Sequence, residues 1–117
     1  PFEKISEQSK SESSAAIRER VIMARKIQEK RFEKEKGIHC NAQMTTSLLH
    51  KHAQPDAQGL TLLKNAMTRL NLSARAYDRI LKVSRTIADL DGCTGILSSH
   101  IAEAISYRSL DRENWAG

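Results

Sequence analysis

Apolar residues recur at helical spacing along most of the chain, and their pattern predicts an all-α fold. The first stripe follows a serine cap, Ser13 or Ser14, and continues until Gly37, a residue that readily ends a helix in the left-handed conformation. We therefore predict a long amphipathic helix over residues 13–36, after a polar lead-in at 1–12 that we expect to be flexible. The stripe consists of Ala16, Ile17, Val21, Ala24, Ile27 and Phe32.

A connector follows at residues 37–54, and Thr46 can cap a short helix within it. Pro55 then interrupts the pattern, because proline has no backbone N–H to donate and restricts the residue before it. The connector therefore separates the long helix from a small helical bundle that we place at residues 55–112, ahead of a polar tail at 113–117.

Three helices are predicted inside this bundle. The first covers about residues 56–70, with Gly59 as an internal weakness of about 1 kcal/mol relative to alanine. Ser73 caps the second, and Ser98 or Ser99 caps the third. No stretch has the alternation of a β-strand, and no repeat occurs at a fixed period. The positions expected to point inward are Leu60, Leu63, Ala66, Met67, Leu70, Tyr77, Ile80, Leu81, Ser84, Ile87, Ala88, Ile101, Ala104 and Ile105, with Tyr107 or Arg108.

The composition fits one small domain with a modest aliphatic core. The 117 residues are 39% hydrophobic but only 4% aromatic. Lysine and arginine number 19 against 14 acidic residues, which gives a formal net charge of +5. That excess favours anionic partners without identifying one.

No apolar run approaches the roughly 20 residues of a membrane span, and the N-terminal segment lacks the hydrophobic stretch of a signal peptide. We therefore predict a cytoplasmic protein with no membrane partner, in which Cys40 and Cys93 are reduced thiols. The chain begins at Pro1 without a methionine, and we expect it to be a piece of a longer polypeptide.

Motifs for catalysis are missing. The phosphate-binding pattern G-x-x-x-x-G-K-[ST] does not occur, so we do not expect this chain to hydrolyse ATP by itself. We predict no metal site, because His39, Cys40, His50 and His52 lack the spacing of ligand pairs. Cys93 has no neighbour in sequence that would activate it, so we interpret it as a turn residue.

The cations on the predicted helix that Ser73 caps are the main indication of a binding site. Arg75 lies two residues after the Ser73 cap, where the helix dipole favours an anion and a guanidinium fork can bind a phosphate. A solvated arginine is the alternative that composition leaves open. The candidates for a nucleic-acid or interface surface are Arg69, Arg79, Lys82 and Arg85, which we expect to be solvated or in an interface.

Four segments, in order, resemble one family. "LSARAYDRILKVSRTIADLDG" (Leu72 to Gly92) is similar to the C-terminal segment of ComM-type, magnesium-chelatase-like AAA+ ATPases. The other three also resemble that family: "ESSAAIRERVIMARKIQEKRF", "NAQM" and "HIAEAISYRSLDR". The resemblance covers about residues 12–112, and it departs from the family at Cys93 and Gly95, where more polar residues are expected.

This resemblance implies the helical lid of an AAA+ ATPase. The matching position for its sensor 2 arginine is Arg75, which would contact an ATP phosphate, with ATP and Mg²⁺ bound only in the full-length protein. The implied partners are the upstream core, neighbouring subunits of a hexameric ring and DNA, since full-length relatives resemble DNA translocases that act in branch migration during natural transformation. A magnesium chelatase subunit is the alternative within the family. A nucleic-acid-binding or protein-interaction helical module is the alternative outside it.

Overall fold

A computed structural model of the chain describes residues 12–110, with side chains for 12–107. The all-α prediction is confirmed, because residues 12–110 contain no strand and only an isolated bridge between Pro55 and Ile96. Nearly all of the predicted lead-in (1–12) and the whole predicted tail (113–117) lie outside the described residues. The helices are α2 (Ser14–Arg31), the short 3-10 helix η1 (Asn41–Gln43), α3 (Thr46–His52), α4 (Ala57–Arg69), α5 (Ala74–Leu90) and α6 (Ser98–Leu110).

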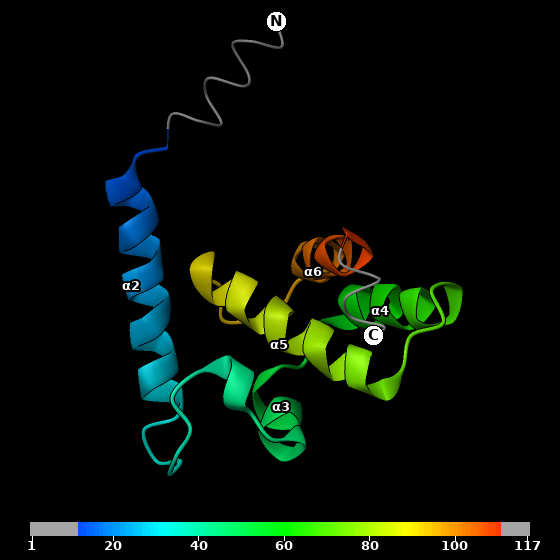
Figure 1. The fold of residues 1–117 in the computed structure, drawn as a ribbon, viewed down its shortest axis with the longest axis horizontal. Coiled ribbons are helices and arrows are strands. Elements are labelled where there is room, and N and C mark those ends of the chain that lie inside the picture. The colour runs from blue at the N-terminus through cyan, green and yellow to red at the C-terminus, as the bar shows by residue number, and fades with distance from the viewer. Residues whose placement is uncertain (1–11, 111–117) are drawn as a thin grey trace, which may run out of the picture.

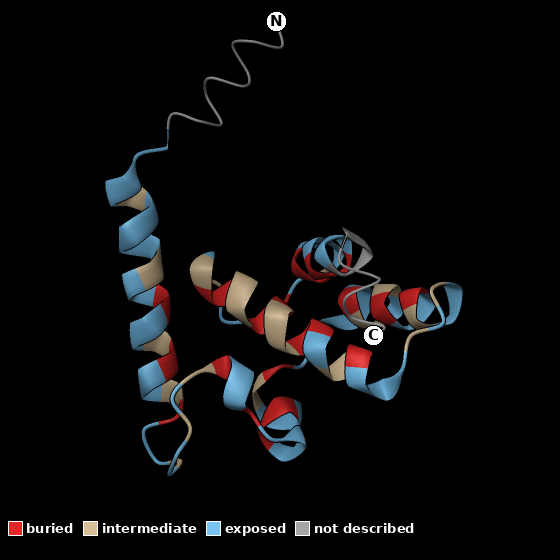
Figure 2. Ribbon diagram, viewed as in Figure 1, coloured by how far each residue is buried: buried red, intermediate tan, exposed pale blue. Residues whose placement is uncertain are grey.

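Helix α5 is the centre of the molecule. It contacts α6, α2, η1 and α3, while α4 packs on α6 (Figure 1). Burial follows this arrangement, since α5 is buried along one side and α2 only toward its C-terminal end (Figure 2). The largest fully buried apolar side chains are Phe32, Leu63, Ile80, Ile96 and Ile101.

Most of the predicted inward positions of the bundle are confirmed. Of the alternatives Tyr107 and Arg108, Tyr107 is 48% exposed on α6, and the side chain of Arg108 lies outside the described residues. In the long helix the prediction for Ile17 is wrong, because this residue is 45% exposed. Leu60, Met67, Leu70, Tyr77 and Ile87 are half-buried. The fully buried positions are Leu63, Ala66, Ile80, Leu81, Ser84, Ala88, Ile101, Ala104 and Ile105.

Polar side chains cap most of the helices. Ser13 accepts a hydrogen bond from the Ala16 amide, and Ser73 accepts one from the Ala76 amide, as the sequence predicts. Two predicted caps are wrong. Thr45 rather than Thr46 caps α3, and α6 begins at Ser98 itself, with the Leu97 amide donating to a histidine ring in the next turn.

Helix α2 ends at Arg31, before the predicted boundary near residue 36. The chain leaves the helix there because Phe32 turns into the core, where it is 2% exposed. Gly37 does adopt a left-handed conformation, with φ +81°, but it reverses the following loop rather than ending the helix. The loop returns to α2, where the Asn41 amide donates to the side-chain oxygen of Gln28 at 3.0 Å.

Gly59 is a packing requirement rather than the internal weakness that the sequence suggested. It lies in the first turn of α4, where its amide donates to the Asp56 cap at 2.7 Å. A β-carbon at this position would lie 3.0 Å from the Asp56 carboxylate and 3.4 Å from a side-chain carbon of Ile101. The absence of a side chain therefore permits both the cap and the close approach of α4 to α6. Across the described residues, no helix has the length and apolarity needed to cross a membrane.

Candidate functional site

The N-terminal half of α5 carries an open groove with a positive lining, which we call the basic groove. Its volume is about 570 Å³. Five of its lining residues lie on α5, and the sixth belongs to η1. The lining residues are Ala42, Arg75, Asp78, Arg79, Lys82 and Val83.

Helix geometry explains why these cations share one groove. Arg75, Arg79 and Lys82 are spaced i, i+4 and i+7, so they project from nearly the same side of α5. The row extends about 10 Å along the helix at 1.5 Å per residue. Arg75 is the second residue of α5, beside the end of the helix dipole that favours anions.

Among the described residues, the lining of the groove is charged and contains no aromatic ring. It contains three cations against one carboxylate, that of Asp78, so a negatively charged group meets a net attraction. Its apolar members are only Ala42 and Val83, and no aromatic ring lines it for stacking. Its donor set suits phosphate oxygens, which arginine binds with a planar fork and lysine as a point charge.

The structure brings together three of the five cations that the sequence singled out. Arg69 is exposed in the last turn of α4 and does not line the basic groove. The expectation that Arg85 belongs to a solvated or interface surface is wrong, because that residue is 3% exposed. Asp89, four residues further along α5, is also buried, with 2% of its surface exposed.

The burial of Arg85 is possible because all three nitrogens of its guanidinium donate hydrogen bonds. Its Nε donates to Asp89 at 3.2 Å, and its Nη2 donates to the Cys93 carbonyl at 2.8 Å. Its Nη1 donates to the carbonyls of His52 and Thr94 at 3.2 and 3.0 Å. Burial lowers the pKa of this guanidinium, and the Asp89 carboxylate acts in the opposite direction. The arginine therefore ties the end of α3 and the loop after α5 to the middle of the molecule.

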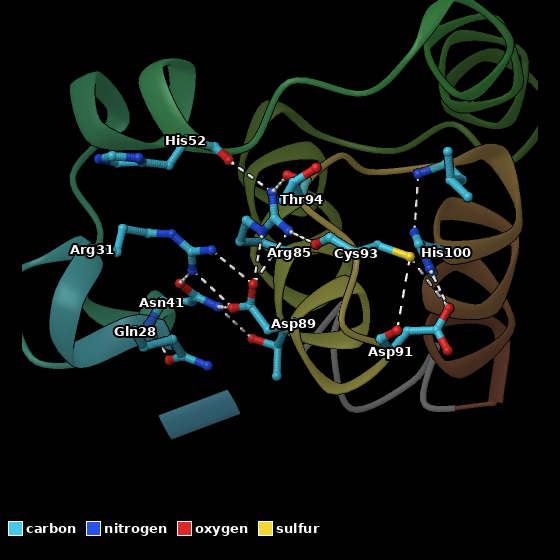
Figure 3. A network of polar contacts seen from close by, with 12 residues as sticks. Gln28, Arg31, Asn41, His52, Arg85, Asp89, Asp91, Cys93, Thr94 and His100 are labelled. Atoms are coloured by element: carbon cyan, nitrogen blue, oxygen red, sulfur yellow. Dashed lines mark hydrogen bonds and ion pairs between the residues drawn. The ribbon is translucent and has the colours of Figure 1, made fainter. Parts of the chain in front are cut away.

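Asp89 receives a second arginine from α2. Arg31 donates to both oxygens of Asp89, with distances of 2.8 Å from Nη1 and 2.7 Å from Nη2 (Figure 3). The Asn41 side chain donates to the same carboxylate at 2.9 Å and accepts from Arg31 at 2.8 Å. These contacts join α2, η1 and α5. We call the cluster the polar hub, and its members are Gln28, Arg31, Asn41, Arg85 and Asp89.

Sequence reasoning missed the polar hub, although two signals for it were present. Arg85 and Asp89 are spaced i, i+4, which suits an ion pair within one helix. Gln28, Arg31 and Asn41 lie in two of the segments that carry the family resemblance, and Asp89 lies in a third. When polar residues occur in several separate segments that all resemble one family, these residues are candidates for contact with one another in the fold.

A second polar cluster lies where α5 leads into α6, and its donor types resemble a metal site. The ligand atoms of Asp91, Cys93 and His100 lie within 4.8 Å of one another. The Leu97 amide, however, donates to Nδ1 of His100 at 3.0 Å. The ring proton therefore sits on Nε2, which donates to Asp91 at 3.1 Å and is not available as a metal ligand. We interpret the cluster as the cap of α6.

Cys93 is not an activated thiol. Desolvation raises its pKa, and the neighbouring Asp91 carboxylate raises it further. The thiol therefore stays protonated near neutral pH, which agrees with its interpretation as a turn residue.

The fold is that of a small all-α domain with three cations lining one groove on its central helix. The chain belongs to the family described as magnesium chelatase, subunit ChlI C-terminal, which matches residues 11–108. It is 41% identical over 103 residues to "Competence protein ComM" of Haemophilus influenzae, covering 88% of this chain and 19% of that protein.

Two further relatives extend this result. "Uncharacterized protein YifB" of Escherichia coli is 39% identical over 101 residues, which cover 86% of this chain and 19% of the relative. "Uncharacterized protein Rv2897c" of Mycobacterium tuberculosis is 34% identical over 97 residues, which cover 83% and 19%. The chain thus spans about a fifth of the length of these relatives. The matches support an AAA+ lid-type domain that forms the C-terminal part of a longer ComM-like protein, with a core upstream in the same polypeptide.

Proposed function

We propose that this chain is the C-terminal helical lid of a hexameric AAA+ ATPase and that Arg75 is its sensor 2 arginine. The observation that supports this role most directly is the position of Arg75, which is exposed in the first turn of α5 inside the basic groove. The dipole of α5 and the neighbouring Arg79 and Lys82 add positive potential at the same place.

In this role the guanidinium of Arg75 stabilises negative charge on a phosphate of ATP. A planar fork can donate two hydrogen bonds to one phosphate, and it gains most where negative charge increases during phosphoryl transfer. When bound, Mg²⁺ offsets charge on the phosphates. The basic groove offers only Asp78 as an anionic ligand, so the ligands of Mg²⁺ belong to the upstream core.

We extend the proposal to the activity of the full-length protein. The relative from Haemophilus influenzae is named a competence protein, so we propose a DNA translocase that acts in branch migration during natural transformation. Insertion of Mg²⁺ as a chelatase subunit is the second activity within the family, and the family description is its support.

Substitution of Arg75 by alanine in the full-length protein tests the lid assignment. ATP turnover should fall by about 10²-fold or more, because the lost contact acts on charge that develops in the transition state. Arg69→Ala is the matched control, since Arg69 is an exposed arginine outside the basic groove. If Arg75→Ala and Arg69→Ala have equal turnover, the sensor 2 assignment is wrong.

A second candidate function is direct binding of nucleic acid by the isolated chain. The row formed by Arg75, Arg79 and Lys82 favours it, because successive phosphates of a strand could follow these cations. Binding of this kind weakens steeply with salt, so a titration of single- and double-stranded DNA at several salt concentrations measures it. Absence of binding at low salt would exclude this candidate and leave the lid role untouched.

A further inference from the structure

The first half of α2 lacks the packing that its second half has. Its buried residues are Ala24 and Gln28, both in the half that approaches α5. The other half projects beyond the bundle and is exposed along most of its surface (Figures 1 and 2). Large apolar side chains are nevertheless exposed in this half and directly after it: Ile17 is 45% exposed, Ile22 44% and Met23 57%. Such side chains in a projecting helix indicate a surface that contacts another protein segment.

A cleft runs between this half of α2 and the corner where α5 leads into α6. Two adjoining hollows of about 390 and 480 Å³ form it, and they share Arg20, Leu90 and Asp91. We call it the acidic cleft. The residues that define it below are Ile17, Arg20, Met23, Leu90, Asp91 and Glu103.

The charge of this cleft is opposite to that of the whole chain. Its carboxylates include Glu12, Glu19, Asp91 and Glu103, whereas Arg20 is the only arginine among the described residues that line it, and it pairs with Glu12. A hydrogen bond from His100 holds the pKa of Asp91 below its usual range, so that carboxylate stays ionised. A net negative, partly apolar cleft on a chain of net charge +5 fits a surface that combines apolar side chains with lysine or arginine.

These properties argue against two occupants. Nucleic acid is excluded by repulsion between its phosphates and the carboxylates. A symmetric contact with a second copy would place the same acidic rim against itself, because a two-fold interface joins identical patches. The remaining occupant is a different protein surface that is basic and apolar.

We propose that the acidic cleft, with the side of α2 that lines it, is the docking site for the upstream core of the same polypeptide. The relatives are about five times as long as the stretch that they share with this chain, which forms their C-terminal part, so in sequence α2 lies between that core and the bundle. The core is held close by covalent connection, which raises its effective concentration at the cleft. The inference rests on the proposed function for the nature of the core, but not on any role of Arg75.

The polar hub determines which part of α2 is available for docking. Arg31 fixes the C-terminal end of α2 to Asp89, while the N-terminal half is left to a partner. An isolated helix of this length is marginal in water, and like-charged neighbours such as Lys26 and Lys30 do not stabilise it. The core therefore completes the stabilisation of α2 that the bundle begins.

Hydrogen exchange of α2 in the isolated chain and in the full-length protein tests the proposal. Amides of residues 14–23 should exchange at least about tenfold more slowly in the full-length protein, while amides of α5 change little. Equal exchange of residues 14–23 in the two proteins would overturn the docking proposal. Protection that rises with the concentration of the isolated chain would identify a second copy as the occupant and would also overturn it.

A pair of adjacent substitutions locates the contact. Met23→Ser and Ile22→Ser each remove an exposed apolar side chain from α2, but only Met23 lines the acidic cleft. In the full-length protein, Met23→Ser should raise the exchange of residues 14–23 toward the rate in the isolated chain, and Ile22→Ser should not. Glu103→Lys should act like Met23→Ser, because it reverses charge in the cleft.

Equal effects of the two apolar substitutions, or no effect of either, would remove the cleft as the docking site. ATP turnover of the Arg75→Ala protein is an independent measurement, so failure of the sensor 2 assignment and failure of the docking proposal can be told apart.

Discussion

The two halves of α5 place the same residue type in opposite surroundings. Arg75 is exposed in the first turn and faces an open groove that attracts anions. Arg85 lies ten residues further along the same helix, is 3% exposed and donates to one carboxylate and three carbonyl oxygens. The comparison shows that an arginine on α5 is exposed or buried according to which segments cover its side of the helix.

Substitution of Asp89 should produce the largest effect on stability. Asp89→Ala leaves the guanidinium groups of Arg31 and Arg85 without their shared carboxylate, and breaking such a buried pair costs about 3–5 kcal/mol. Urea unfolding of the isolated chain measures the change. Asp78→Ala removes an aspartate from the basic groove at the other end of α5 and should alter stability by less than about 0.5 kcal/mol.

Parallel substitutions of the two arginines test the comparison itself. Arg85→Met should lower the free energy of unfolding by about 2–4 kcal/mol, because it leaves one carboxylate and three carbonyl oxygens short of a donor. Arg75→Met should change it by less than about 0.5 kcal/mol, since Arg75 is exposed. Chemical denaturation of both variants provides the measurement, and equal losses would contradict the division of α5 into two environments.

Inorganic triphosphate should perturb only one half of α5. We expect amide chemical-shift changes in a titration of the isolated chain to fall within residues 74–83 and to be absent from 85–90, because the cations of the hub already have acceptors. The changes should weaken as salt is raised. Lys82→Gln should reduce them without altering the fold, while shifts that map to the hub would show that its arginines accept an external anion.

Acidification should cause the smallest effect. Burial lowers the pKa of His52, and the nearby Arg31 lowers it further, so the folded chain binds this proton less readily than the unfolded chain does. The contribution of His52 is therefore complete above its ordinary pKa of 6.5 and is lost gradually as the pH falls below that value. Thermal unfolding between pH 7.5 and 5.5 measures it, and His52→Gln should flatten the dependence within this window.

Helical periodicity was sufficient to predict the fold, because each helix buries one stripe of residues. It also placed Arg75, Arg79 and Lys82 on one side of α5, where the basic groove lies. It failed at Arg85, since the pattern of a single helix does not reveal that the end of α3 and the loop after α5 supply acceptors for this guanidinium.

The ends of helices were predicted less well than their existence. Gly37 looked like the end of the first helix, but Phe32 leaves the helix earlier to enter the core. That choice depends on a distant partner, since the Phe32 ring meets the edge of His52 at a centroid distance of 5.8 Å. The local sequence does not indicate such a contact. The same is true of Gly59, whose small size is required by Ile101 on another helix.

The polar hub also makes α5 a lever. Asp89 fixes one end of the helix to α2, and Arg75 lies 14 residues away at the other end, which corresponds to about 21 Å at 1.5 Å per residue. A tilt of about 5° around this fulcrum displaces the Arg75 end by about 2 Å, enough to make or break a hydrogen bond. In the proposed lid role, a displacement of α2 would therefore be transmitted through the Asp89 carboxylate to the position of the Arg75 guanidinium.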